Sequence, residues 1–261
     1  MSIADKLQTI QNIKENIKTA INNKGGNVDN NFTEYADAIN NLPTGGGITK
    51  ISVKDSGVKF AHSTFSEVPE YYDFEGVTDM LDMFNNCTKL TTIPLIDTSN
   101  VTNMNSMFYY ALSLKTIPLI NTSNVTDMYQ MFKFCTDLTT IPQLNTSNVT
   151  NMYQMFANCN NLKSIPPLMA DNLDCYNGIF GSSLDNLTDF GGLINLKTDM
   201  AGSYGFQKCP NLTYQSCINI LNGLADVTTL GGRTLKVHQN FLNLVGDEIS
   251  IGTSKNWVII A

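Results

Sequence analysis

Residues that could carry out acid–base or nucleophilic catalysis are few in this chain and lie far apart. The two histidines, His62 and His238, have no serine, cysteine or carboxylate at a spacing typical of a catalytic dyad or triad. Asp and Glu are sparse between residues 77 and 172, so a carboxylate pair for glycoside hydrolysis is hard to find there. We therefore predict that the protein is not an enzyme and has no catalytic residues.

The six cysteines do not have the spacing of metal ligands. Cys87, Cys135 and Cys159 recur at one position of a repeat, where Ala111 stands once. A position shared by Cys and Ala requires a small buried side chain, which a free thiol supplies well. A disulfide or a metal site is the alternative. We predict no metal and no cofactor.

Charge and hydropathy exclude two kinds of partner. The net charge of −7 disfavours a nucleic-acid phosphate backbone, and no apolar run is long enough to span a bilayer. We predict neither nucleic-acid binding nor membrane insertion. The first residues, Met1 to Lys6, lack the apolar core of a signal peptide. We therefore expect the chain to be made in a cytoplasm, without export by the general secretory route.

Four copies of a 24-residue repeat lie between residues 77 and 172. Two dipeptides mark the copies: Met83-Phe84, Met107-Phe108, Met131-Phe132 and Met155-Phe156, and Ile93-Pro94, Ile117-Pro118, Ile141-Pro142 and Ile165-Pro166. Self-similarity at a fixed period in the twenties is typical of stacked repeat proteins. One copy buries too few apolar side chains to offset the entropy of ordering its backbone, so neighbouring copies must stack.

The pattern within one copy predicts a helix followed by a short strand. Ser99 can act as the helix N-cap. An apolar stripe at steps of three, three, one and three residues follows it: Val101, Met104, Met107, Phe108 and Ala111. Residues 114–118 then form an extended segment that ends at a proline. Asp97 lies in a turn, where a short polar side chain can bond its own backbone. We therefore predict an α/β solenoid of helix–strand units.

The flanks of the repeats divide the chain further. We predict that residues 1–44 form an amphipathic helical hairpin and that residues 45–47 form a glycine linker. We expect residues 48–76 to cap the solenoid, residues 77–212 to hold the repeats, and residues 213–261 to form the C-terminal cap. So small a hairpin needs a partner, either a second copy or another protein. Its anchor residues are Ile3, Leu7, Ile10, Ile17, Phe32, Tyr35 and Ile39.

The C-terminal cap has its own pattern of elements. Apolar residues at steps of three predict a helix over residues 213–226, and two short helices are expected over 241–245 and 247–254. Residues 234–238 are predicted to form a strand, and Trp257 to Ile260 a closing strand. A terminal unit of different architecture protects the last apolar face of a repeat stack.

The repeated unit resembles a known family. Its pattern Met-Phe-x-x-Cys-x-x-Leu-x-x-Ile-Pro, followed by Asp/Asn-Thr-Ser-Asn-Val-Thr-x-Met, is similar to the BspA-type leucine-rich repeats of bacterial surface and phage proteins. The likeness covers roughly residues 65–212. It implies a leucine-rich-repeat solenoid used for binding, with a strand shorter than is usual for such repeats.

The flanking segments resemble phage proteins. The run Ala4-Asp5-Lys6-Leu7 and residues 32–39 are similar to the amino-terminal segment of many phage tail, baseplate and fibre proteins, and the last residues resemble the closing cap of phage repeat proteins. The resemblance implies a non-enzymatic virion protein whose hairpin docks into the particle, with a homo-oligomeric state expected. The solenoid would contact a host surface protein or glycan, or neighbouring subunits. A bacterial surface adhesin is the second hypothesis, and a carbohydrate-degrading enzyme the third.

Exposed positions of the repeat change between copies, whereas core positions barely change. Asn85-Asn86 becomes Tyr109-Tyr110 and then Lys133-Phe134, and Leu81 becomes Asn105 and then a tyrosine. These changes gather aromatic side chains in neighbouring units, where an aromatic surface can anchor a protein or sugar partner. The alternative is that the rings pack only against one another. The predicted partner-binding residues are Tyr109, Tyr110, Tyr129, Phe134 and Tyr153.

Overall fold

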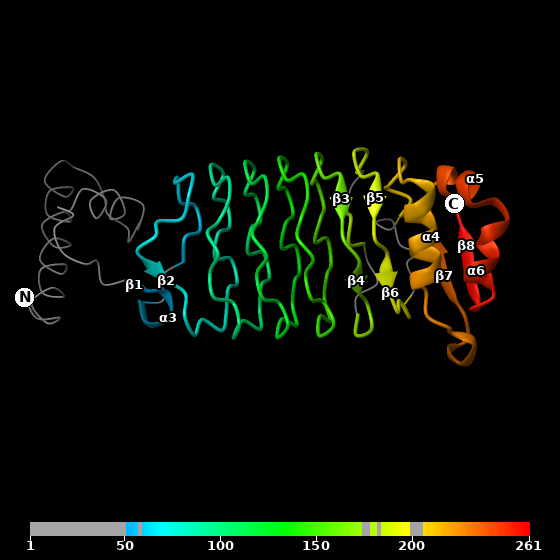
Figure 1. The fold of residues 1–261 in the computed structure, drawn as a ribbon, viewed down its shortest axis with the longest axis horizontal. Helices are drawn as coiled ribbons and strands as arrows, with labels where there is room; N and C mark the ends of the chain where they lie inside the picture. The colour runs from blue at the N-terminus through cyan, green and yellow to red at the C-terminus, as the bar shows by residue number, and fades with distance from the viewer. Residues whose placement is uncertain (1–50, 57–58, 174–177, 182–183, 199–205) are drawn as a thin grey trace, which may run out of the picture. The chain divides into compact units, whose positions relative to one another are not determined.

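Successive 24-residue units lie side by side and are hydrogen-bonded at equivalent positions (Figure 1). The computed structural model describes residues 51–56, 59–173, 178–181, 184–198 and 206–261, all within the compact unit Thr49–Ala261. In three of the units a phenylalanine N–H donates to a methionine carbonyl of the next unit over 2.8–3.0 Å. These donor and acceptor pairs are Phe84 and Met107, Phe108 and Met131, and Phe132 and Met155.

Among the described residues the strands are short, and every pair is parallel. They are β1 (Ile51–Ser52), β2 (Tyr72–Asp73), β3 (Ser164–Ile165), β4 (Leu168–Met169), β5 (Asp189–Phe190), β6 (Leu193–Ile194), β7 (Arg233–Lys236) and β8 (Trp257–Ile260). Four two-stranded sheets result, β1–β2, β3–β5, β4–β6 and β7–β8. Between the middle units the strand pairing reduces to single-residue parallel bridges, such as Asn103 with Asp127.

The predicted α/β leucine-rich-repeat solenoid of 24-residue helix–strand units is wrong, because residues 59–173 contain no α-helix. The segment expected to be helical consists of turns, in which the N–H of Met107 donates to the carbonyl of Met104 over 3.2 Å. Ser99 caps no helix; its N–H donates to Oδ1 of Asp97 over 2.9 Å. The strand expected over residues 114–118 is not formed either.

Short polar side chains favour these turns over a helix. Asp79, Asn103, Asp127 and Asn151 stand at one position of the repeat, and each accepts a hydrogen bond from the N–H two residues further on. Such local bonding competes with the helical hydrogen bond. The backbone also has positive φ at two further positions of each unit, for example 53° at Ser106, which an α-helix does not contain.

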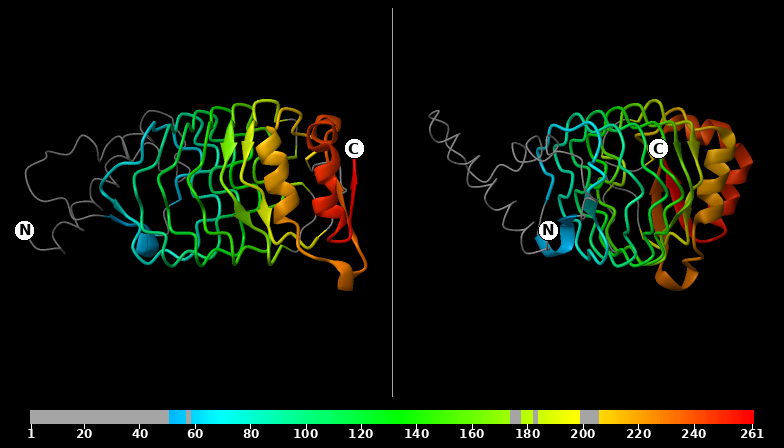
Figure 2. Two further views of the ribbon diagram at one scale, coloured as in Figure 1. Left: turned by 45° about the vertical axis from the view of Figure 1, so that its right-hand side comes forward. Right: turned by 60° about the vertical axis from the view of Figure 1, so that its left-hand side comes forward.

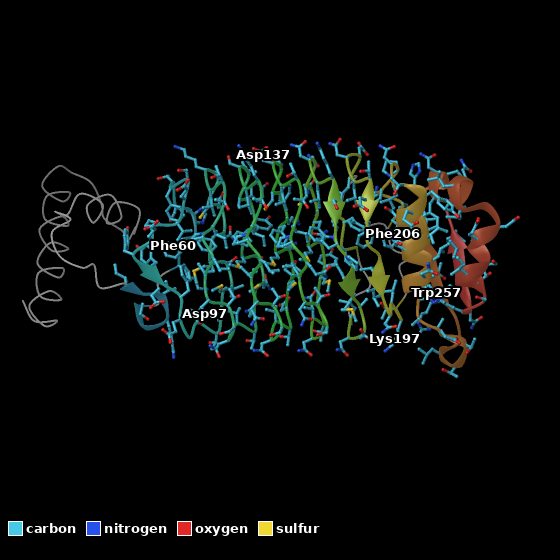
Figure 3. The ribbon with its side chains drawn as sticks, in the orientation of Figure 1. Phe60, Asp97, Asp137, Lys197, Phe206 and Trp257 are labelled. Atoms are coloured by element: carbon cyan, nitrogen blue, oxygen red, sulfur yellow. The ribbon has the colours of Figure 1, made fainter. Side chains whose placement is uncertain are left out.

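The apolar stripe forms the core of the stack despite this different backbone. The rings of Phe60, Phe84, Phe108, Phe132 and Phe156 lie nearly parallel, with neighbouring centroids 5.5–5.8 Å apart. Each of these rings is buried. Figure 3 shows Phe60 and Phe206 inside the stack, whereas Asp97 and Asp137 point outward at opposite edges.

The repeated cysteines are buried free thiols, which confirms the prediction of a small buried side chain at that position. Each Sγ donates to a phenylalanine carbonyl 27 residues earlier, over 2.9 Å for Cys87, 3.1 Å for Cys135 and 3.0 Å for Cys159. Burial raises the pKa of the Cys87 thiol to about 12. These thiols are therefore protonated hydrogen-bond donors within the core.

Helices gather where the repeats end (Figure 2). The described helices are α3 (Val53–Ser56), α4 (Tyr214–Gly223), α5 (Gln239–Val245) and α6 (Ser250–Thr253), with the 3₁₀ helices η1 (Thr228–Leu230) and η2 (Gly246–Ile249). The helix expected over 213–226 and the closing strand from Trp257 to Ile260 are confirmed as α4 and β8. Among the described residues, no helix has the length and apolar character needed to cross a bilayer.

The predicted hairpin lies outside the described residues, together with its anchor residues and the glycine linker. The anchor residues are Ile3, Leu7, Ile10, Ile17, Phe32, Tyr35 and Ile39. Their role and the predicted domain boundaries therefore stay predictions.

Candidate partner-binding site

The predicted partner-binding residues project from the turns that run along one side of the stack. The N–H groups of Ser106 and Tyr110 donate to the carbonyls of Tyr129 and Lys133 in the next unit, over 2.8 and 2.9 Å. Gln130 and Phe134 donate in the same way to the following unit. This ladder holds equivalent side chains of adjacent units beside one another. Positions 24 residues apart in the sequence therefore become neighbours on the surface.

Three aromatic rings meet on this side. The rings of Tyr110 and Phe134, at equivalent positions of adjacent units, have centroids 4.3 Å apart. Tyr109 lies 5.0 Å from Tyr110 and 5.9 Å from Phe134, edge-on to the latter. Tyr110 is exposed, whereas Tyr109 and Phe134 are half-buried. The rings therefore pack on one another and still present part of their surface to solvent.

A lysine completes this group. Nζ of Lys133 lies 5.9 Å from the centroid of Tyr109 and 5.5 Å from that of Phe134, within the range of a cation–π contact. It donates a hydrogen bond to Oε1 of Gln154 over 2.6 Å. Partial burial lowers the pKa of Lys133 below that of an ordinary lysine. The ammonium group is thus held at the surface against neutral partners.

A second pair of rings continues the surface into the next unit. Tyr129 and Tyr153 stack with centroids 5.6 Å apart and an interplanar angle of 21°. The amide of Gln130 donates to Oε1 of Gln154 over 3.0 Å. Burial raises the pKa of Tyr109, with smaller contributions from the nearby Tyr110 and Tyr129. We call the set Tyr109, Tyr110, Tyr129, Lys133, Phe134 and Tyr153 the aromatic patch.

Two rings of the aromatic patch stand on left-handed backbone. The φ angles are 60° at Tyr110 and 65° at Phe134, and the equivalent residues Asn86 and Asn158 have φ of 58° and 61°. Asparagine tolerates this conformation because its side chain can bond locally, whereas a bulky residue pays a steric cost of roughly 1–2 kcal/mol. Two units of the stack therefore keep an aromatic side chain where asparagine would be less strained.

All five predicted partner-binding residues thus lie on one side of the stack in two ring groups, Tyr109, Tyr110 and Phe134 in one and Tyr129 and Tyr153 in the other. That they bind a partner stays a prediction. Sequence reasoning left out Lys133 and Gln154. Lys133 stands at one of the exposed positions that change between copies, so the same comparison could have found it.

The residues considered for chemistry have structural roles. His62 shares a hydrogen bond with Asn86 over 2.9 Å, and Nδ1 of His238 accepts from the N–H of Asn240 at the start of α5. Asp97 bonds the backbone of its own turn, and these hydrogen bonds, with that of the Ser99 N–H first, lower its pKa. Among the described residues, no group of three or more His, Cys, Asp or Glu could hold a metal ion.

Residues 56–168 match the family model described as "Mycoplasma protein of unknown function, DUF285". This range includes the four copies of the Met-Phe pair. No curated protein matches the chain, and no solved structure matches it. The repeated segment is therefore similar to that family. The description of this family names neither BspA-type repeats nor phage proteins, so both resemblances stay predictions.

Proposed function

We propose that this protein is a non-enzymatic structural and binding component of a phage virion, of the tail, baseplate or head-fibre type. In this proposal the aromatic patch contacts the host surface or a neighbouring subunit. The placement in a virion is supported by the resemblance of the flanking segments to phage proteins. The binding role is supported by the aromatic patch itself.

One observation carries the binding role: Tyr110 and Phe134 keep aromatic side chains on left-handed backbone. Strained residues of this kind cluster at functional sites, where the strain persists because the side chain is needed. Mutual ring contact recovers about 0.5–1.5 kcal/mol for a pair in addition to the burial of ring area, against a steric cost of roughly 1–2 kcal/mol for each residue. Partner binding gives a reason to keep aromatic side chains at these strained positions, because tyrosine is enriched among residues that dominate binding energy.

The N-terminal segment supplies the second half of the proposal. Its resemblance to phage tail, baseplate and fibre proteins supports a hairpin that docks the chain into the particle, with other virion proteins or a second copy as its partner. An assembly in several copies would multiply weak contacts at each aromatic patch, because linked sites bind with high effective concentration.

Mass spectrometry of purified virions, from the phage whose genome encodes the chain, tests the placement. We expect the protein in intact particles, and its absence there would end the virion proposal. The binding role is tested by adsorption of particles that carry Tyr110→Asn together with Phe134→Asn. We expect normal particle incorporation and reduced adsorption to host cells or reduced subunit assembly.

A matched control is Leu119→Asn, which changes a side chain 63% exposed in the same stack but outside the aromatic patch. We expect this variant to adsorb and assemble like the unchanged protein. Equal loss in the control and in the double variant would show that any exposed substitution disturbs the stack. Unchanged adsorption and assembly in the double variant would remove the binding role of the aromatic patch.

A bacterial surface adhesin is the second candidate function. The matched family model is described as a Mycoplasma protein, which names a bacterium and not a phage. An adhesin would use the same aromatic patch on a cell surface. Antibody labelling of intact bacterial cells that express the gene, without prophage induction, separates the two. Labelled cells favour the adhesin, whereas detection restricted to released particles favours the virion component.

A further inference from the structure

The geometry points to a carboxylate-bearing carbohydrate, such as a chain containing sialic or uronic acid, as the ligand of the aromatic patch. This inference rests on the proposed binding role of the aromatic patch and adds the chemical class of the ligand. Three observations carry it: the hydrogen-bonding state of Lys133, the combination of rings and amides around it, and the side-chain types present at the surface.

Lys133 has hydrogen-bonding capacity to spare. An ammonium group has three donors, and the described contacts of Nζ are one hydrogen bond to Oε1 of Gln154 and two ring faces. Within the described part of the chain no carboxylate forms an ion pair with it, and burial alone acts on its pKa. A partly desolvated cation without a counter-ion is a favourable place for an incoming carboxylate, because such hydrogen bonds are shorter and stronger than neutral ones.

The groups around Lys133 fit a hydroxyl-rich ligand. Tyr109 and Tyr110 offer ring surface together with phenolic hydroxyls. The amide of Gln154 accepts hydrogen bonds from Lys133 and from the amide of Gln130. A tyrosine presents an apolar body and a polar end, which matches the apolar ring faces and the peripheral hydroxyls of a sugar. The stacked pair of Tyr129 and Tyr153 extends this surface, so more than one sugar residue can lie along it.

Lys133 distinguishes the aromatic patch from the core of a protein–protein interface, in which aromatic residues are likewise enriched. The cores of protein–protein interfaces are depleted in lysine, yet Lys133 belongs to the aromatic patch and lies against Tyr109 and Phe134. The most exposed aliphatic side chains, Leu95 and Leu119, project from a different position of the repeat. The aromatic patch thus combines rings, hydroxyls, amides and one cation, without an exposed aliphatic anchor of its own.

The negative net charge of the chain bears on how an acidic ligand would be held. At −7 the protein repels anions in general, so an acidic sugar must be held by the local cation and not by the overall field. Binding should therefore depend strongly on one lysine and should barely respond to removal of another.

Saturation-transfer NMR and calorimetry on the full chain test the inference. The probes are 3′-sialyllactose, a tetrasaccharide containing glucuronic acid, neutral lactose, and an acidic peptide of alternating glutamate and serine. We expect at least one of the acidic sugars to bind, with protons of its sugar rings receiving saturation, while lactose binds at least about tenfold more weakly. Binding of the acidic peptide but of neither acidic sugar would overturn the carbohydrate assignment.

Three variants assign the binding to the aromatic patch. Lys133→Gln should weaken binding of the acidic sugar at least about tenfold, because it removes a charge-assisted hydrogen bond. Lys133→Arg keeps the charge and the ring contacts and should retain most of the affinity. Lys115→Gln removes an exposed lysine outside the aromatic patch and should leave the affinity unchanged. Equal losses in Lys133→Gln and Lys115→Gln would contradict the inference.

Failure of this inference can be told apart from failure of the proposed function. If no acidic sugar binds at millimolar concentration but the Tyr110→Asn, Phe134→Asn particles lose adsorption or assembly, the aromatic patch binds another ligand and only the sugar assignment fails. If the acidic sugars bind through Lys133 while those particles adsorb and assemble normally, the ligand class holds and the role in the virion fails.

Discussion

Residues 103–111 of the second unit and helix α4 have the same apolar spacing but different backbones. Each has four buried apolar residues at steps of three, one and three, if the C-cap Leu224 is counted with α4: Met104, Met107, Phe108 and Ala111 in the unit, and Cys217, Ile220, Leu221 and Leu224 at α4. The first segment forms turns bonded to the next unit, whereas the second forms a helix of ten residues. Apolar spacing therefore decides which side chains are buried in both regions, and it decides the backbone in neither.

The difference lies in where the backbone hydrogen bonds find partners. In the unit, the N–H groups of Met104 and Phe108 donate to carbonyls of the next unit over 2.9 Å. In α4 the N–H of Cys217 donates to the carbonyl of Thr213, four residues earlier, over 3.0 Å. Buried backbone polar groups must be paired, and a copy stacked alongside offers an alternative to the helix. Residues near the end of the stack lack a further copy of the unit and form helices.

The largest expected effect comes from the ring stack that the units share. Phe108→Ala should destabilise the fold by about 3–5 kcal/mol, because Phe108 is fully buried and stacks on Phe84 and Phe132. Chemical denaturation followed by circular dichroism measures the change. Ile220→Ala is the comparison in α4, with an expected loss of about 2–5 kcal/mol. A loss below about 1 kcal/mol for Phe108→Ala would mean that the ring stack contributes little to stability.

The N-cap of α4 offers a test of what stabilises the helix in this comparison. The side chain of Thr213 accepts from the N–H of Ser216 over 3.3 Å, as an N-cap does. Thr213→Ala should therefore cost about 0.5–2 kcal/mol. Thr213→Ser keeps the accepting oxygen and should cost much less. If the two variants lose the same stability, the cap is not what fixes the beginning of this helix.

The sequence predicts much of the packing but not the backbone of the unit. The period of 24 residues, the buried Met-Phe pairs and the small side chain shared by Cys and Ala follow from comparing copies. Comparing the copies does not distinguish a helix from a series of turns, because both can bury residues at steps of three and four. The distinguishing signal is the Asp or Asn at the position of Asn103, which lies within the predicted helix and accepts a hydrogen bond from the N–H of Asn105.

Part of the candidate site can also be predicted by comparing the copies of the repeat. Changes between copies identify the exposed aromatic residues, and stacking at a fixed step makes them neighbours. The cation–π position of Lys133 and the left-handed backbone of Tyr110 depend on the turn geometry. Neither can be derived from a unit that is assumed to be helical.

A smaller effect is expected at the turn that replaces the helix. Oδ1 of Asp127 accepts from the N–H of Tyr129 over 2.8 Å, and Asp127→Ala should cost about 0.5–1.5 kcal/mol. Asp127→Asn is the matched control, since Asn103 and Asn151 make the same bond at the equivalent positions of neighbouring units. We expect Asp127→Asn to be close to neutral in thermal denaturation. A loss as large as that of Asp127→Ala would show that the negative charge, and not the turn, stabilises this position.

The smallest change in stability is expected at Tyr110, where two effects of similar size oppose each other. Tyr110→Asn relieves a left-handed backbone cost of roughly 1–2 kcal/mol and removes ring contacts worth about 0.5–1.5 kcal/mol. The net change should lie within about 1 kcal/mol. Tyr110→Ala loses the same contacts and keeps most of the backbone cost, so it should be the less stable of the two variants. If denaturation shows equal stability for both, the left-handed backbone at Tyr110 carries no strain, and the argument from strain to binding fails with it.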